Sequence, residues 1–185
     1  FNMYGGNISN NSAIGGNTYG GGVFAGGTFN MYGGSITGNT ASDGGSGVIV
    51  NISAKTGNVG TFTVSGNVNI TDNKTTKGQP DNVYLEKSED GTRLASITIG
   101  STLNVSEKIG VRTANKPTEE NPIVIATGVS SGVEDNFVCD DSNYVVAYEN
   151  GNLVLKTNPN PPAPEPEHKH YICGETHQSI GDHTS

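Results

Sequence analysis

Residues able to bind a metal ion gather at the C-terminal end of the sequence. All four histidines of the chain lie there with Cys173 among them, at His168, His170, His177 and His183. Imidazole nitrogen and thiolate sulfur are ligands that Zn²⁺ prefers, and the spacing of Cys173 and His177 suits a zinc site. We therefore take His168, His170, Cys173 and His177 as a candidate zinc site; no other cofactor is expected. The alternative is that these side chains are solvated and hold no metal, because a single exported thiol is readily oxidised.

Carboxylates form the second group of residues able to do chemistry. Two of them can act as acid and base on a glycosidic bond, and several together can hold Ca²⁺. In residues 1–79 the acids are Asp43 and Asp72, which stand in different contexts, and the later acids come as adjacent pairs. Residues 140–143 offer oxygen ligands but lack the spaced calcium-loop pattern. Because no nucleophile or phosphate-binding motif is present either, we predict no catalytic residue and no enzyme activity.

Tyr4 and Tyr32 are candidates for contact with sugars. They occupy equivalent positions of a repeat, so they would stack on one face, with Tyr19 near the next corner. Aromatic ladders can bind glycans, but the chain contains no Trp. Stacked tyrosines also stabilise a sheet without any ligand, and we favour that structural interpretation.

A repeat of 28 residues positions these side chains. Residues 1–6 read FNMYGG and residues 29–34 read the same letters, while residues 8–13 match residues 36–41. A period of this length is typical of an array in which each unit is too small to bury its own apolar face. Apolar and polar residues alternate in short runs separated by Gly-rich or Asn-rich corners, which predicts separate strands before and after the Gly pair at 33–34.

Equivalent residues fall into columns if successive units lie over one another. The predicted apolar columns are Phe1, Phe29 and Phe62; Met3, Met31 and Val64; Ile8, Ile36 and Ile70; and Val23 with Val48. The last Ile match needs a one-residue insertion near residues 68–69, and a longer insertion at 52–59 should project as a hairpin or loop. A polar column of Asn11, Asn39 and Asn73 should form a structural ladder, because corner Asn side chains can hydrogen-bond from coil to coil.

Such columns suit parallel strands that wind round an axis, each coil about 4.8 Å above the last. The motifs are Gly22-Val23-Phe24, Gly27-Thr28-Phe29-Asn30-Met31, the run from Gly33 to Ala41, Gly47-Val48, and the run from Thr61 to Asn73. They resemble the right-handed parallel β-helix repeats of bacterial surface proteins, of the pectate-lyase-like superfold. The resemblance implies an all-β fold, a right-handed parallel β-helix or β-solenoid. A later segment, from Asp81 to Val111, is similar to one that follows such repeats in large secreted proteins of Gram-positive gut bacteria.

Four segments are expected along the chain. They are Gly/Asn-rich β-helix repeats at 1–79, irregular β-helix coils or a β-cap at 80–156, a Pro-rich linker at 157–167, and a truncated His/Cys-containing tail module at 168–185. Terminal coils should be atypical, because an open last coil would offer unpaired strands to other chains. We interpret the whole chain as a piece of a longer exported protein.

Composition limits the partners. The net charge of −8 argues against a nucleic acid, whose binding depends on Lys and Arg neutralising phosphates, and against an anionic membrane surface. No apolar run is long enough to insert in a membrane. A hydrophobic fraction of 32% implies a thin core spread along an axis.

These observations predict a non-catalytic structural and adhesive segment of a large secreted bacterial surface protein, at the cell surface or cell wall. Its partners would be neighbouring coils of the same chain and a host or cell-wall glycan or surface protein. The alternative is that the chain belongs to a carbohydrate-active β-helix enzyme, a polysaccharide lyase or hydrolase, whose catalytic coils lie outside this segment.

Overall fold

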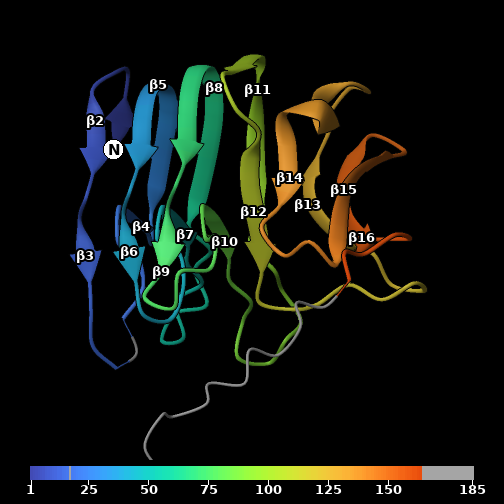
Figure 1. The fold of residues 1–185 in the computed structure, drawn as a ribbon, viewed down its shortest axis with the longest axis horizontal. Helices are drawn as coiled ribbons and strands as arrows, with labels where there is room; N and C mark the ends of the chain where they lie inside the picture. Colours follow the sequence, from blue (N-terminus) through green and yellow to red (C-terminus); the bar gives the residue numbers. More distant parts are fainter. Residues whose placement is uncertain (17, 164–185) are drawn as a thin grey trace, which may run out of the picture.

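The computed structural model describes residues 1–16 and 18–163. In this part of the chain the architecture is all-β, with parallel sheets stacked along one axis and no α-helix. Figure 1 shows the coils side by side along the horizontal axis, from β2 and β3 on the left to β15 and β16 on the right. The chain is therefore a β-solenoid, as the repeat predicts. Among the described residues, no helix is long and apolar enough to cross a membrane.

Three parallel sheets form the solenoid. The first sheet contains β1 (Asn2–Met3), β2 (Asn7–Ser9), β5 (Thr28–Thr37), β8 (Thr61–Thr71) and β11 (Ile97–Val105). The second sheet contains β3 (Ser12–Ala13), β6 (Thr40–Ala41) and β9 (Lys74–Thr75). The third sheet contains β4 (Val23–Ala25), β7 (Val48–Val50), β10 (Val83–Leu85), β12 (Ile109–Thr113) and β14 (Phe137–Cys139). The early coils therefore visit the three sheets in the same order.

The predicted side-chain columns run along the axis. The rings of Phe1 and Phe29 stack with their centroids 5.6 Å apart, and those of Phe29 and Phe62 with their centroids 5.3 Å apart. The other in-register columns are Met3, Met31 and Val64; Ile8, Ile36 and Ile70; and Val23 with Val48. Most of these side chains belong to one apolar core, whose burial is the main stabilising contribution to the fold.

The first sheet has longer strands than the alternation predicts. Instead of separate strands before and after the Gly pair at 33–34, β5 is continuous across it. Gly34 has a φ of 96°, and a Cβ atom there would lie 2.5 Å from the carbonyl oxygen of Gly6. Glycine therefore lets the strand bend where the coils approach closely, without loss of pairing.

The extra residue of the third coil lies earlier than expected. The register changes between the pair Met31–Val64 and the pair Gly33–Asn67, which places a β-bulge at residues 65–66 rather than near residues 68–69. Gly66 has a φ of 70°, a conformation that suits a bulge and that other residues rarely adopt. The longer insertion at 52–59 projects as predicted, with an antiparallel bridge between Ile52 and Val59 at its base.

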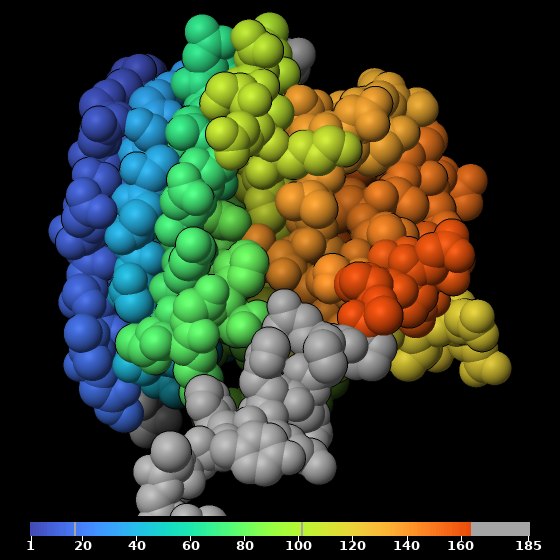
Figure 2. Space-filling view, viewed as in Figure 1, coloured from blue at the N-terminus to red at the C-terminus, as the bar shows by residue number. Residues whose placement is uncertain are grey.

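A cap of a different kind closes the C-terminal end of the core. Its three strands, β13 (Ile123–Thr127), β15 (Tyr144–Glu149) and β16 (Asn152–Thr157), form an antiparallel sheet in the order β13-β16-β15. The 3₁₀ helix η1 (Val133–Asn136) stands between β13 and β14. Ile125, Leu153 and Leu155 are almost completely buried and belong to the same core as the coils. Figure 2 shows the C-terminal part of the described chain, in orange, covering the right-hand end of the stacked coils.

Candidate functional site

The predicted zinc ligands His168, His170, Cys173 and His177 all lie outside the described residues, as do residues 164–167 of the Pro-rich linker. The zinc site therefore stays a prediction. Within the part of the chain that the structure describes, no group of three or more His, Cys, Asp and Glu side chains could hold a metal ion.

Asn11, Asn39 and Asn73 form a continuous hydrogen-bonded column between the first and second sheets. Oδ1 of Asn39 accepts hydrogen bonds from the backbone N–H and Nδ2 of Asn11, at 3.0 and 2.9 Å. Oδ1 of Asn73 accepts the same pair from Asn39, again at 3.0 and 2.9 Å. Nδ2 of Asn39 and Nδ2 of Asn73 also donate to the carbonyl oxygens of Ile8 and Ile36. The buried amides thus join one coil to the next with their polar atoms satisfied.

Two residues outside the repeat extend this column. Oδ1 of Asn82 accepts from the backbone N–H and Nδ2 of Asn73, at 3.2 and 3.1 Å. The carboxylate of Asp140 then accepts from the backbone N–H and Nδ2 of Asn82, at 2.7 and 2.9 Å. The Asn ladder, as we call the column of Asn11, Asn39, Asn73, Asn82 and Asp140, therefore reaches from the first coil to the residue after β14. Sequence analysis missed its last two members, because they do not follow the 28-residue period.

Asp140 and Asp141 have roles in local structure. Both carboxylate oxygens of Asp140 are bonded to Asn82, and Oδ1 of Asp141 accepts from the backbone N–H and Nδ2 of Asn143, at 3.0 and 2.8 Å. Burial raises the pKa of Asp140 to about 6, although the two hydrogen bonds from Asn82 act in the opposite direction. The carboxylate oxygens considered as calcium ligands thus already hold a ladder end and a turn.

A cavity of about 290 Å³ lies between the third sheet and the cap. Tyr84 of β10, Arg112 of β12, Tyr144 of β15 and the corner residue Asp43 all line it. Nη2 of Arg112 lies 2.7 Å from Oδ1 of Asp81, and its guanidinium carbon lies 5.2 Å from the centroid of the Tyr84 ring. We call this space the junction cavity, because it separates the regular coils from the antiparallel cap.

Asp81 is completely buried, and its neighbours compensate its charge. Oδ2 accepts hydrogen bonds from the backbone N–H and Oγ of Ser46, at 2.8 and 2.7 Å, while Oδ1 pairs with Arg112. A buried carboxylate without such partners would be strongly destabilising. Nε of Arg112 is buried and has no hydrogen-bond partner among the described residues. The ion pair of Arg112 with Asp81 thus joins the fourth coil to the third. Nε of Arg112 is the donor that this ion pair does not use.

Two groups that line the junction cavity, Tyr84 and Cys139, have raised pKa values. Burial is the main cause of the raised pKa of Tyr84, which the charge of Arg112 partly offsets. Burial also raises the pKa of Cys139 to about 11, so this residue is a neutral thiol at neutral pH and a poor nucleophile. The cavity therefore offers hydrogen bonding and aromatic contact, which can bind a small polar group.

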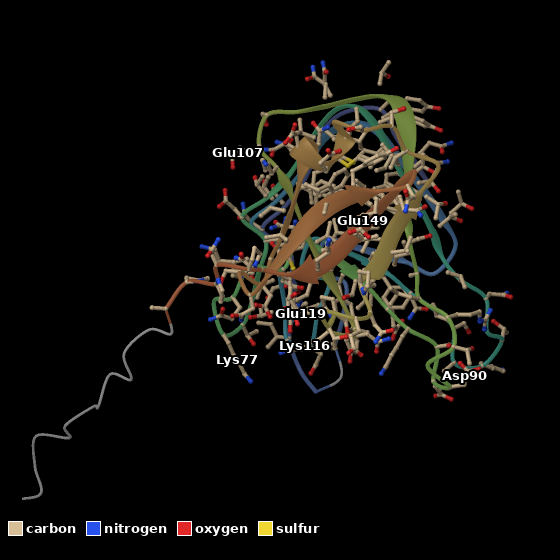
Figure 3. The ribbon with its side chains drawn as sticks, turned by 90° about the vertical axis from the view of Figure 1, so that its right-hand side faces the viewer. Lys77, Asp90, Glu107, Lys116, Glu119 and Glu149 are labelled. Atoms are coloured by element: carbon tan, nitrogen blue, oxygen red, sulfur yellow. The ribbon has the colours of Figure 1, made fainter. Side chains whose placement is uncertain are left out.

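Charged side chains are otherwise spread over the surface. Figure 3 views the molecule from the cap end and shows Lys77, Asp90 and Glu107 around the outline of the coils. On the cap, Nζ of Lys156 lies 2.5 Å from Oε1 of Glu149, and both side chains are substantially exposed. Exposed ion pairs of this kind contribute little to stability.

Tyr4 and Tyr32 stack on the outer face of the first sheet, as the repeat predicts. Their ring centroids are 5.1 Å apart, and the planes differ by 19°. Both rings are exposed to solvent. Tyr19 is not part of this stack: it bridges to Gly44, and Gly44 lies against the ring of Tyr84 at the junction cavity.

Comparisons with known proteins gave no relatives for this chain. No family model matches it, and neither the curated proteins nor the solved structures contain a match. The parallel pairing of the strands is what shows the β-solenoid fold.

Proposed function

We propose that this chain is a non-catalytic structural and adhesive module of a large secreted protein, displayed at a bacterial cell surface or cell wall. The observation that carries the proposal is the Asn ladder, which joins Asn11 to Asp140 by side-chain hydrogen bonds. Together with the stacked Phe column, it makes successive coils into a stiff rod. A rod of this kind holds exposed surfaces at a distance from its attachment point.

The ionisable residues near the junction cavity support a role without catalysis. The charge of Asp81 is compensated by Ser46 and Arg112, Asp140 is bonded to Asn82, and Cys139 is a neutral thiol. A polysaccharide lyase or hydrolase needs carboxylates or a cationic base directed at the sugar. The carboxylates described here are instead used to join coils.

An activity assay tests this proposal. The purified chain is incubated with polygalacturonate and other acidic glycans, with and without Ca²⁺, and we expect no unsaturated products and no new reducing ends. The heat-denatured chain is the control. Turnover by the folded chain would overturn the non-catalytic assignment and favour the carbohydrate-active alternative.

The surface location has its own test. Antibodies raised against the folded chain should label intact cells of the source organism, and a brief protease treatment of those cells should remove the label. Labelling that appears only after the cells are permeabilised would contradict display at the surface.

A further inference from the structure

The tyrosine column on the outer face of the first sheet stops after two rings. Tyr4 covers one face of Tyr32, and the position opposite Tyr32 in the next coil is the bulge formed by Ser65 and Gly66. A Cβ atom at Gly66 would lie 2.2 Å from the carbonyl oxygen of Tyr32, so only glycine fits there. The second face of Tyr32 is therefore directed toward a coil that supplies no third ring.

A shallow groove begins at this position and crosses four coils. One hollow of about 600 Å³ is lined by Tyr4 and Tyr32 of the first two coils, by Gly66 and Asn67 of the third, and by Thr102 and Asn104 of the fourth. An adjoining hollow of about 410 Å³ shares Asn67 and Asn104 with it. We call the two hollows together the outer groove. It lies on a different sheet from the junction cavity, so the two sites can be tested separately.

The outer groove is polar but carries no formal charge. Among the described residues, no Asp, Glu, Lys, Arg or His lines either hollow. Nδ2 of Asn104 donates to Oδ1 of Asn67 at 3.0 Å, which leaves further donors and acceptors on both exposed amides. Oδ1 of Asn69, at the base of the second hollow, is buried and has no hydrogen-bond partner. These groups suit a ligand rich in hydroxyl groups and without charge.

The groove runs across the strands, so the groups that line it repeat from coil to coil at about 4.8 Å. A sugar ring stacked on Tyr32 therefore lies level with the third coil, beside Asn67, and the rest of the glycan continues from the edge of that ring.

We infer that the outer groove binds a neutral glycan, with one sugar ring stacked on the free face of Tyr32. The apolar C–H face of a sugar is a partner for an aromatic ring, and the hydroxyl groups at its edge can bond to the amides of Asn67 and Asn104. The inference gives the adhesive role proposed above a ligand class and a location, and it rests on that role. The sugar takes the place in the stack that a third tyrosine would have occupied.

Calorimetric titration with defined hexasaccharides tests the inference. The probes are cellohexaose, mannohexaose, xylohexaose and chitohexaose, with hexagalacturonate as the charged comparison. We expect the chain to bind at least one neutral hexasaccharide, with an affinity that does not change between low and high salt. Tyr32→Ala should weaken that binding about tenfold, which corresponds to about 1.4 kcal/mol. Tyr32→Phe keeps the ring face and should bind within about twofold of the unchanged protein.

Matched variants separate the groove from the rest of the surface. Phe24→Ala removes an exposed ring from the third sheet and should leave binding unchanged. Asn104→Ala should weaken binding several-fold without changing the melting temperature, because its side chain is exposed. Equal binding by Tyr32→Ala and the unchanged protein would overturn the inference and leave an adhesive role elsewhere intact. Failure of every neutral probe, or preference for hexagalacturonate, would also overturn it, whereas the activity assay bears only on the non-catalytic assignment.

Discussion

The first three coils and the cap bury their apolar side chains in different ways. In the coils like residues lie over one another, as Phe29 lies over Phe62 along parallel strands in register. In the cap, antiparallel strands pair unlike residues, such as Tyr148 of β15 with Leu153 of β16. The coils therefore repeat one packing arrangement of side chains, whereas the cap closes the core with an arrangement that occurs once.

Because of this difference, the effect of a substitution on the free energy of unfolding should depend on its position within a column. A residue in the middle of a column has a like neighbour on each side, and a residue at its end has only one. In the cap no such gradient is expected, because each side chain has its own environment. Substitutions at middle, end and cap positions should therefore differ in their effect on stability.

The largest loss is expected at the middle of the Phe column. Phe29→Ala should lower the free energy of unfolding by about 4 kcal/mol, because Phe29 stacks between Phe1 and Phe62 and its loss opens a cavity in a core that excludes water from this ring. Urea denaturation measures the loss. Phe1→Ala, at the exposed end of the same column, is the matched control and should cost less than about 1 kcal/mol. Equal losses for the two variants would show that column position does not determine stability.

The Asn ladder should show a similar but smaller gradient. Asn73→Ala leaves the buried backbone N–H of Asn39 without an acceptor, and we expect a loss of about 3 kcal/mol in the free energy of unfolding. Asn11→Ala removes only the exposed end of the ladder and should cost about 1 kcal/mol or less. Chemical denaturation of both variants provides the comparison. A larger loss for Asn11→Ala would contradict the proposed order.

The end of the ladder near the cap should give stability a dependence on pH. Because the pKa of Asp140 is raised from 3.8 to about 6, the folded state binds this proton more tightly than the unfolded state does. The resulting stabilisation is fully present below pH 4 and is lost as pH rises through 6, an effect on the order of 2 kcal/mol. Urea midpoints between pH 4 and 7 measure it.

Asp140→Asn should remove this part of the pH dependence, whatever its effect on stability at one pH. Asp90 is the control, because hydrogen bonds from Ser88 and Thr92 lower its pKa to about 2. Its contribution is present above pH 3.8 and disappears only as pH falls through 2, so Asp90→Asn should keep the slope between pH 4 and 7. An unchanged slope in Asp140→Asn would show that other groups cause the dependence.

The smallest effect is expected on the cap surface. Lys156→Ala breaks the ion pair with Glu149, but exposed pairs of this kind contribute less than about 1 kcal/mol. The melting temperature should fall by a few degrees at most, and by less in high salt. A loss as large as that of Phe29→Ala would mean that the cap, rather than the column, limits stability.

The repeating coils could be predicted from the sequence, whereas contacts between residues outside the repeat could not. The columns of Phe, Met, Ile and Asn were predictable, because a fixed period places equivalent residues at the same register in every coil. The ladder residues Asn82 and Asp140 were not, because they are 58 positions apart and follow no period. The pairing of Arg112 with Asp81 likewise depends on how two unlike coils meet.

The ends of the strands and the position of the bulge within the repeats could not be predicted from the alternation of apolar and polar residues either. The letters do not show that two runs merge into the single strand β5, because a Gly pair can either end a strand or bend it. Nor do they place the bulge at residues 65–66, since the alternation tolerates an extra residue at several points. That bulge is the feature on which the outer groove depends, so the candidate site required the structure.

The direction of the hydrogen bonds between coils has a mechanical consequence. These bonds lie nearly parallel to the long axis, so a force that pulls the two ends apart opens them one after another instead of shearing a whole sheet at once. Each coil of about 28 residues would release roughly 95 Å of chain as it detaches. Such a rod would lengthen stepwise under load and dissipate work at each step, which would spare whatever it is tethered to.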